Sequence, residues 1–295
     1  MRYVQPQLRF ASCLSLLCLF LISFSCSEDL TAPEPYAPDE TATAKALRDC
    51  VYDTAPDYTG DQTCTDVSNP INVGRLDCRA QTPSGQARAG YREFNNYGVY
   101  TIYGGFTSDT RRAVRVERRF KNFKRGASKT ALFKTTFKIS DISASHTYIA
   151  QTHASKNVVV GPCKGKKHTS AFWLLRAEPK PGNANKIDLY REESVRPYVQ
   201  GGTGDCARGS RTKTYLMTID RNKDYSLEVK TGYNSSQRSF AEIIIDGRKF
   251  RKNQTFTTEE MYFRFGAYRA HASGSNSNRK AVVRFKNTEY CHPNY

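Results

Sequence analysis

The 295-residue chain has little of what several classes of protein require. It has one Trp and three Met, and no long segment with a helical period, which disfavours a helical bundle. No CxxC pair occurs and its five His form no ligand spacing, so we expect no metal and no cofactor. The absence of a repeat at a fixed period argues against a propeller. What remains is a chain rich in Tyr and Phe, which are typical of strands.

Acidic residues are also scarce, with 28 Asp and Glu against 45 Lys and Arg, for a formal net charge of +17. Such a charge favours a polyanionic partner, which can be nucleic acid, anionic lipid or an acidic polysaccharide. The 38% of hydrophobic residues is enough to build a core, so wholesale disorder is excluded.

The first segment is predicted to be an export signal. Arg2 and Arg9 precede the apolar run Leu14–Ile22, which is too short to span a bilayer and has the length of a signal-peptide core. The run ends in Ser-Phe-Ser before Cys26, which resembles a bacterial lipoprotein cleavage site with Cys26 as the lipidated residue. The alternative is an ordinary signal peptide cleaved near Ser25. We therefore predict an outer-membrane or cell-surface lipoprotein, otherwise a secreted protein, which disfavours a nucleic-acid partner.

The charge divides the mature chain into two parts. Residues 26–62 hold nine acidic and two basic residues, whereas residues 63–295 carry a formal net charge of +22. We predict a signal peptide over residues 1–25, an acidic flexible tether over 26–45 and one domain over 46–295. A short helix is expected over Ala42–Val51. The membrane is expected to be contacted only through the lipid on Cys26, and the protein is expected to be a monomer.

Six cysteines remain after the signal peptide and Cys26 are set aside. An even number in an exported protein predicts disulfides, and six cysteines allow fifteen pairings among which the sequence does not choose. They are Cys50, Cys64, Cys78, Cys163, Cys206 and Cys291.

The remainder of the sequence predicts an all-β domain, because short β-type runs alternate with turns such as Asp246-Gly247. Many short strands at regular spacing favour a sandwich, a jelly roll or a barrel. The expected strands are Tyr97–Tyr103, Ala113–Phe120, Ala131–Ile139, Thr147–Thr152, Asn157–Val160, Ala171–Arg176, Lys186–Tyr190, Thr214–Ile219, Ser226–Val229, Phe240–Ile245, Met261–Tyr268 and Ala281–Phe285.

Three of these strands place acid–base and anion-binding side chains on one face, because residues two apart in a strand point the same way. Gly266 in the third strand is expected to leave room for a bound polymer. The rows are Arg115, Glu117 and Arg119; Gln151 and His153; and Tyr262, Arg264, Gly266 and Tyr268.

The three segments resemble the signatures of the alginate lyases of polysaccharide lyase family seven and of related jelly-roll uronate lyases, including ulvan lyases. Those signatures, R-(S/T)-E-L-R, Q-(I/V)-H and Y-F-K-A-G-x-Y, occur here in order, and the resemblance covers about residues 95–290. The chain departs from them at Val116, Arg118, Thr152, Arg264 and Phe265. The resemblance implies a β-jelly roll, a two-sheet antiparallel sandwich with a concave substrate cleft.

The resemblance also implies a reaction and a role for each residue. A lyase removes the proton beside a uronate carboxylate and eliminates the glycosidic oxygen. Gln151 and Arg115 would stabilise the developing negative charge, and Tyr268 would be the acid. The base would be either His153 or Tyr268 itself. The residues expected to bind substrate are Arg119, Glu117, Arg264, Tyr262 and His271, with Glu117 orienting the arginines and Arg264 gripping an anionic group with its planar fork.

The predicted function is therefore β-elimination on an acidic, uronate-containing polysaccharide, either alginate or a sulfated polymer such as ulvan, with glucuronan as a third option. The alternative is a non-catalytic module on the same fold that binds acidic polysaccharide and does not need Tyr268. Nucleic-acid binding is supported by charge alone, without a matching motif.

Overall fold

The computed structural model describes residues 50–53, 75–79, 88–103, 114–143, 145–168, 170–194, 198–199, 204–207, 209–269 and 280–293. The predicted signal peptide and tether, with Cys26, Cys64 and His271, lie outside these residues. Within them every regular element is a β-strand, and no helix is long and apolar enough to cross a membrane. The helix expected over Ala42–Val51 is wrong at its end, because Cys50 and Val51 belong to a strand.

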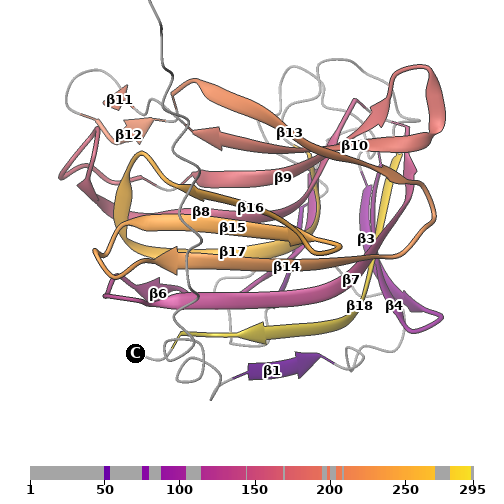
Figure 1. Ribbon diagram of the computed structural model, residues 1–295, viewed down its shortest axis with the longest axis horizontal. Helices are drawn as coiled ribbons and strands as arrows, with labels where there is room; N and C mark the ends of the chain where they lie inside the picture. The colour runs from indigo at the N-terminus through magenta and orange to yellow at the C-terminus, as the bar shows by residue number, and fades with distance from the viewer. Residues whose placement is uncertain are drawn as a thin grey trace, which may run out of the picture. The chain divides into compact units, whose positions relative to one another are not determined.

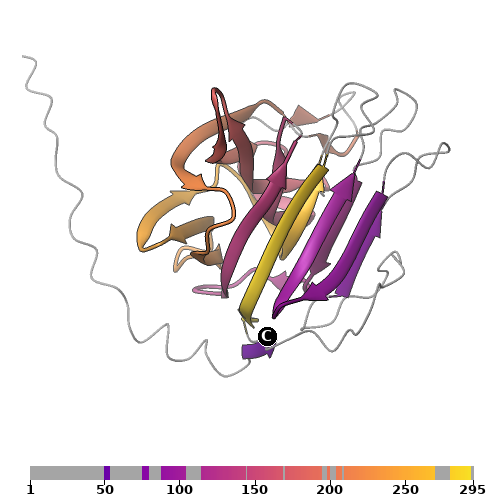
Figure 2. The ribbon, with the colours of Figure 1, turned by 90° about the vertical axis from the view of Figure 1, so that its right-hand side faces the viewer.

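Most of the described strands lie in two eight-stranded antiparallel sheets, and Figure 1 shows β16, β15, β14, β7 and β18 of the first sheet one beside the next. The first sheet runs, in spatial order, β16 (Arg248–Asn253), β15 (Ser239–Ile245), β14 (Tyr225–Tyr233), β7 (Thr130–Ile142), β18 (Lys280–Cys291), β4 (Tyr97–Tyr103) and β3 (Arg88–Phe94), with β1 (Cys50–Asp53) paired to β18. Figure 2 shows the yellow β18 beside the purple strands β4 and β3.

The second sheet carries the three predicted motifs. Its order is β13 (Arg211–Asp220), β10 (Asn183–Ser194), β9 (Ala171–Lys180), β8 (Thr147–Val160), β17 (Thr257–Arg269), β5 (Val114–Arg119) and β2 (Arg75–Arg79), with β6 (Phe123–Lys124) paired to β17. A small separate sheet pairs β11 (Tyr198–Val199) with β12 (Cys206–Ala207).

The core lies between the two sheets and is largely aromatic. Phe133 of the first sheet packs against Phe263 and Phe265 of the second, with ring centroids 4.8 and 4.7 Å apart. Trp173 of β9 is fully buried in the same core. Aromatic rings bury a large area per residue and pack well edge to face, which is why a chain with so much Tyr and Phe folds as a sandwich. The all-β jelly-roll prediction is confirmed.

Each predicted strand overlaps an observed one, with differences in extent; the run expected over Ala113–Phe120, for example, forms β5 only over Val114–Arg119. The runs expected over Thr147–Thr152 and Asn157–Val160 form one long strand, β8, while β3 had not been predicted. The basic segment Arg248–Asn253 forms the edge strand β16, whose side chains are mostly exposed. Edge strands rich in Lys and Arg resist pairing with other chains, which explains its composition.

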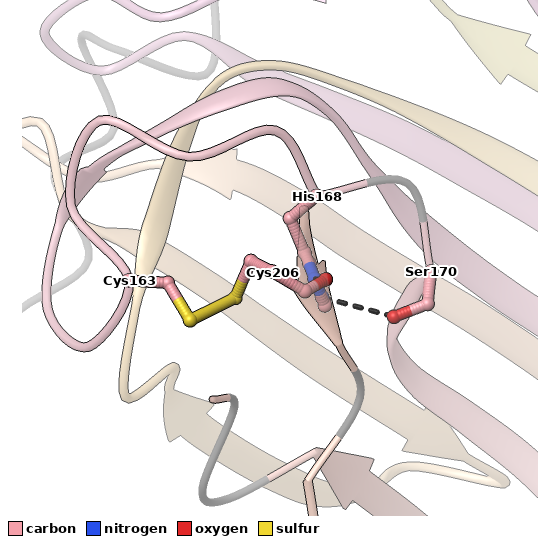
Figure 3. Close-up of a disulfide and its surroundings, with 4 residues drawn as sticks. All are labelled: Cys163, His168, Ser170 and Cys206. Carbon is pink, nitrogen blue, oxygen red and sulfur yellow. Dashed lines mark hydrogen bonds between the residues drawn. A yellow bond between two sulfur atoms is a disulfide. The ribbon is translucent and has the colours of Figure 1, made fainter. Parts of the chain in front are cut away.

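One disulfide joins Cys163 and Cys206, 43 residues apart, with a Cα–Cα distance of 5.7 Å (Figure 3). Beside it, the buried His168 donates from Nδ1 to the Cys206 carbonyl oxygen at 2.9 Å, and its Nε2 lies 2.9 Å from Ser170 Oγ. Cys291 is also disulfide-bonded, and its backbone lies opposite Cys50 of β1. The Cys163–Cys206 bond fixes the segment that leads into β13, an outer strand of the sheet that carries the site.

Candidate functional site

The three motif strands are direct neighbours in the second sheet, with β17 between β8 and β5. On one side β17 places Tyr268 opposite Arg115 and Arg264 opposite Arg119. On the other side it places Arg264 opposite Gln151 and Tyr262 opposite His153. Phe263, Phe265 and Ala267 point into the core, as the alternation predicts. Residues far apart in the sequence therefore form one outward-facing patch.

A buried ion network lies under this patch. Arg264 donates to Asp77 Oδ2 at 2.6 Å and to Glu117 Oε2 at 3.4 Å, and Arg115 reaches the same Asp77 oxygen at 3.5 Å. Burial alone would lower the pKa of Arg264, but Tyr262 and the carboxylates of Glu117 and Asp77 outweigh it and raise that pKa. The Arg264 side chain is only 5% exposed and its charge is already compensated. The sequence predicted that Arg264 binds substrate, whereas this geometry favours a positioning role.

Gln151 links the two strands on either side of β17. Its amide nitrogen donates to Glu117 Oε1 at 2.5 Å, and its amide oxygen lies 3.1 Å from His153 Nε2. The Gln151 side chain thus fixes both Glu117, which it holds toward Arg264, and the ring of His153. That Glu117 orients the arginines stays a prediction.

Gly266 serves the packing of the strands and not a space for substrate. Its φ is +141°, a conformation that favours glycine, and a Cβ there would lie 2.3 Å from the Val116 carbonyl oxygen and 3.1 Å from the Tyr100 ring. The missing side chain would therefore point between β5 and the first sheet. The expectation that Gly266 leaves room for a bound polymer is wrong.

Tyr262 lies between two other site residues. The Arg119 guanidinium sits 4.3 Å from its ring centroid, and the His153 ring stacks on it at 5.1 Å with 11° between the planes. Arg119 is held by Asn122 Oδ1 at 3.3 Å, and within the described residues no carboxylate lies within ion-pair distance of it. Burial lowers the pKa of Arg119. Among the described arginines of the patch, Arg119 is the one best placed to receive an anion from solution.

Tyr268 is at the other end of the patch. Its ring lies 5.1 Å from the Arg115 guanidinium and 5.4 Å from the ring of Tyr148. Burial raises the pKa of Tyr268, and the positive charge of Arg115 opposes that effect. The phenol is therefore protonated at neutral pH and beside a cation that would stabilise the phenolate.

Behind Tyr268 a second polar cluster extends the site toward β13. Tyr148 donates to Glu192 Oε2 at 2.9 Å, and Arg176 and Arg211 both form ion pairs with Glu192. Hydrogen bonds from Arg211 and Arg176 overcome the effect of burial and lower the pKa of Glu192. This cluster ties the ring of Tyr148, and through it Tyr268, to three further strands.

Sequence reasoning missed Asp77, Tyr148 and Glu192. Asp77 lies on a short strand outside the three motifs, so only its alternation with Leu76 and Cys78 could have indicated it. Tyr148 is an odd number of residues from Gln151, and strict alternation would place the two on opposite faces. A β-bulge between Tyr148 and Ala150 brings both to the same face.

Among the residues that the structure describes, no group of three or more His, Cys, Asp or Glu is arranged to hold a metal ion. The patch itself presents guanidinium, amide, imidazole and phenol groups.

An all-β antiparallel sandwich of two sheets is the architecture of the jelly-roll polysaccharide lyases. The family model of the PL28 ulvan lyases matches residues 37–292, and the chain belongs to this family. It is 27% identical over 252 residues to an endo-acting ulvan lyase from Formosa agariphila. The match covers 77% of this chain and 44% of that protein, so the chain spans less than half of its relative's length.

A solved structure supports the fold. The marine family-seven alginate lyase from Zobellia galactanivorans superposes with a TM-score of 0.50 at 16% sequence identity, covering 68% of this chain and 80% of that one. At this identity the likeness shows the fold alone.

Proposed function

We propose that the protein is a polysaccharide lyase that cleaves ulvan, a sulfated uronate polymer, by β-elimination. Membership of the ulvan lyase family supports this choice among uronate polymers. The observation that carries the proposal is the patch itself, where Tyr268 lies against Arg115 on the same face as Gln151, His153 and Arg119. Proton removal beside a carboxylate requires a group that takes the proton and cations that stabilise the developing negative charge, and the patch offers a phenol and arginines for these roles.

Tyr268 is proposed to act as both base and acid. His153 lies opposite Tyr262, six residues from Tyr268, which is roughly 20 Å along the strand at about 3.3 Å per residue. This separation of the two backbones favours one residue for both proton transfers. The reacting form would be the minor phenolate form of Tyr268, which Arg115 stabilises. The phenolate would take the proton and become a neutral phenol, and the phenol would then give that proton to the leaving glycosidic oxygen and return to the phenolate. His153, which Gln151 holds and which stacks on Tyr262, would bind the substrate at the end of the patch away from Tyr268.

Arg119 is proposed to bind an anionic group of the polymer. Its half-buried guanidinium lies over the Tyr262 ring and would take the anion-binding role that the sequence had assigned to Arg264. A carboxylate or sulfate there would receive two charge-assisted hydrogen bonds. The buried network of Arg264, Asp77 and Glu117 lies beneath Arg119 and would hold the arginines of the patch in place.

Ultraviolet absorbance of the unsaturated uronate product tests this function on ulvan, alginate and glucuronan. The wild-type protein should produce it on ulvan, and Tyr268→Phe should lose at least about a hundredfold of turnover while still binding the polymer. His153→Ala should raise KM more than it lowers kcat. Polymer binding without product on any substrate would instead indicate a non-catalytic binding module.

We also propose that the protein is exported and carries lipid on Cys26. The support is the apolar run Leu14–Ile22 followed by Ser-Phe-Ser-Cys. Metabolic labelling with a fatty acid in a bacterial host should mark the wild-type protein and not Cys26→Ala. Label on neither protein would favour a secreted form.

A further inference from the structure

A row of paired residues crosses the second sheet from strand to strand. Arg115 of β5 lies opposite Tyr268 of β17, which lies opposite Tyr148 of β8. Tyr148 in turn lies opposite Arg176 of β9, Arg176 opposite Tyr190 of β10, and Tyr190 opposite Tyr215 of β13. Figure 1 shows β8, β9, β10 and β13 one beside the next.

The whole row faces outward. Leu175 and Ala177, which flank Arg176, and Leu189, which precedes Tyr190, belong to the core between the sheets. The rings of Tyr148 and Tyr268 pack together in a cluster separate from that core. Five strands from β17 to β13 span four strand spacings, roughly 19 Å at about 4.8 Å each. The row is therefore long enough to follow several sugars of one polymer.

The half of the row nearest β13 differs chemically from the half around Tyr268. Its cations are compensated: Arg176 pairs with Glu178 and Glu192, and Lys213 pairs with Glu178 at 3.1 Å while lying 4.3 Å over the Tyr190 ring. What this end offers is aromatic surface. It suits the apolar C–H face of a sugar ring better than another anion.

Tyr215 is the exposed member of this aromatic end. At 53% exposure it is one of two exposed large hydrophobic residues among those described; the other, Phe94, lies on the first sheet. Its ring meets that of Tyr190 edge to face at 5.7 Å, and its hydroxyl lies 2.9 Å from Thr218 Oγ1. A single exposed aromatic needs no explanation, but this one is held at the end of a row that begins at Tyr268.

We propose that Tyr215, supported by Tyr190, forms a distal sugar-binding subsite, so that the polymer crosses the strands along this row. The inference rests on the proposed function in that it extends the site around Tyr268. A sugar stacked on Tyr215 would anchor a long chain while sugars nearer to Tyr268 enter the reacting position one after another. The subsite selects for polymer over short fragments.

The test compares Tyr215→Ala with Tyr215→Phe, which keeps the ring, and with Phe94→Ala, an equally exposed aromatic on the other sheet. Loss of one aromatic contact should raise the KM for ulvan polymer by about two- to tenfold, with kcat unchanged. The KM for short ulvan oligosaccharides, which do not reach β13, should stay the same. Tyr215→Phe should restore most of the polymer affinity, and Phe94→Ala should behave as wild type.

An unchanged polymer KM in Tyr215→Ala would overturn the subsite, as would an equal loss on oligosaccharides or in Phe94→Ala. Retardation in native gels containing ulvan measures the same contacts without turnover. If the wild-type protein cleaves no ulvan, the proposed reaction fails, and retardation of Tyr268→Phe with and without Tyr215→Ala still decides the subsite. Equal retardation of those two proteins would overturn it.

Discussion

At the scale of single residues, burial and pairing decide which cation of the site can meet a substrate. Arg264 and Arg119 lie opposite each other on neighbouring strands, yet the first is bonded to Asp77 and Glu117 and the second to the amide of Asn122. Two buried carboxylates need a buried cation. Arg264 supplies it, which leaves Arg119 for the polymer.

We therefore expect Arg264→Ala to lower the free energy of unfolding more than it lowers the affinity for the polymer. It would leave the carboxylates of Asp77 and Glu117 buried together without their closest cation, a loss of about 3–5 kcal/mol. Arg264→Lys keeps the charge but loses the planar fork of the guanidinium, so its free energy of unfolding should lie between those of the wild type and Arg264→Ala. Denaturant unfolding of the three proteins measures the effect. Wild-type stability of Arg264→Ala combined with a tenfold higher KM would restore the substrate-binding role that the sequence predicted.

His146 should make the protein sensitive to acid. Burial, with Arg176 nearby, lowers the pKa of its imidazole from 6.5 to about 4, and its ring packs edge to face on Tyr148 at 5.1 Å. The unfolded chain therefore takes up a proton at higher pH than the folded chain does. Stability contributed by the neutral imidazole is fully present above about pH 6.5 and is lost as the pH falls toward 4, by about 3 kcal/mol.

His146→Phe, which keeps a ring against Tyr148, should remove that part of the acid sensitivity. The unfolding free energies of the two proteins, measured from pH 7 to pH 4, should diverge as the pH falls, with the wild type losing more. Parallel curves would show that His146 does not titrate on unfolding.

At the scale of elements, β17 holds the site because each of its edges is fitted to a neighbour. The Gly266 backbone approaches β5 so closely that a Cβ would meet the Val116 carbonyl oxygen, and the β17–β8 register shifts between Phe265 and Tyr268. The shift sets where Tyr268 lies against Tyr148. A change at Gly266 should therefore disturb Tyr268 without touching it.

Gly266→Ala should destabilise the fold by about 2–4 kcal/mol, since it combines backbone strain with a steric clash. Gly247→Ala is the matched control: its φ is +78°, but nothing lies within 4 Å of the added Cβ, so about 1–2 kcal/mol of strain should be the whole cost. Thermal or denaturant unfolding compares the two. Equal losses would show that the approach of β17 to β5 imposes no steric limit.

The same element shows how far the sequence reaches. Period-two alternation placed Phe263, Phe265 and Ala267 in the core and Tyr262 and Tyr268 outside, and the structure agrees. Alternation failed at Tyr148, where the bulge has no sequence signature because its flanking residues are ordinary strand formers. At Gly266 the sequence did carry a signal, since an isolated glycine in a strand indicates a bulge or a close backbone approach, but it was interpreted as room for a polymer.

Ion pairs across distant strands were equally out of reach. Asp77 is 187 residues from Arg264, and only the strand order brings them together. The six cysteines allow fifteen sets of pairings, and it is the fold that brings Cys163 to Cys206.

At the scale of the whole molecule, net charge predicts a kind of partner but not the surface that binds it. Residues 63–295 carry +22, yet many cations are engaged within the structure. On the first sheet Lys230, Lys249 and Arg251 surround the buried Glu242. The binding of a polyanion should therefore depend on the few cations that lack a carboxylate partner more than on the total charge.

Salt should weaken polymer binding through those few cations. Between about 0.1 M and about 1 M salt the Debye length falls from about 10 Å to about 3 Å, so the KM for ulvan should rise while kcat changes little. The slope of log KM against log salt counts the cations that release counterions when the polymer binds. Arg119→Gln should reduce that slope by about one, because the half-buried Arg119 has no carboxylate partner in the described structure. Arg251→Gln, which removes the same charge from the first sheet, should leave the slope unchanged. A KM independent of salt, or equal slopes for both variants, would place the binding surface away from the patch around Tyr268.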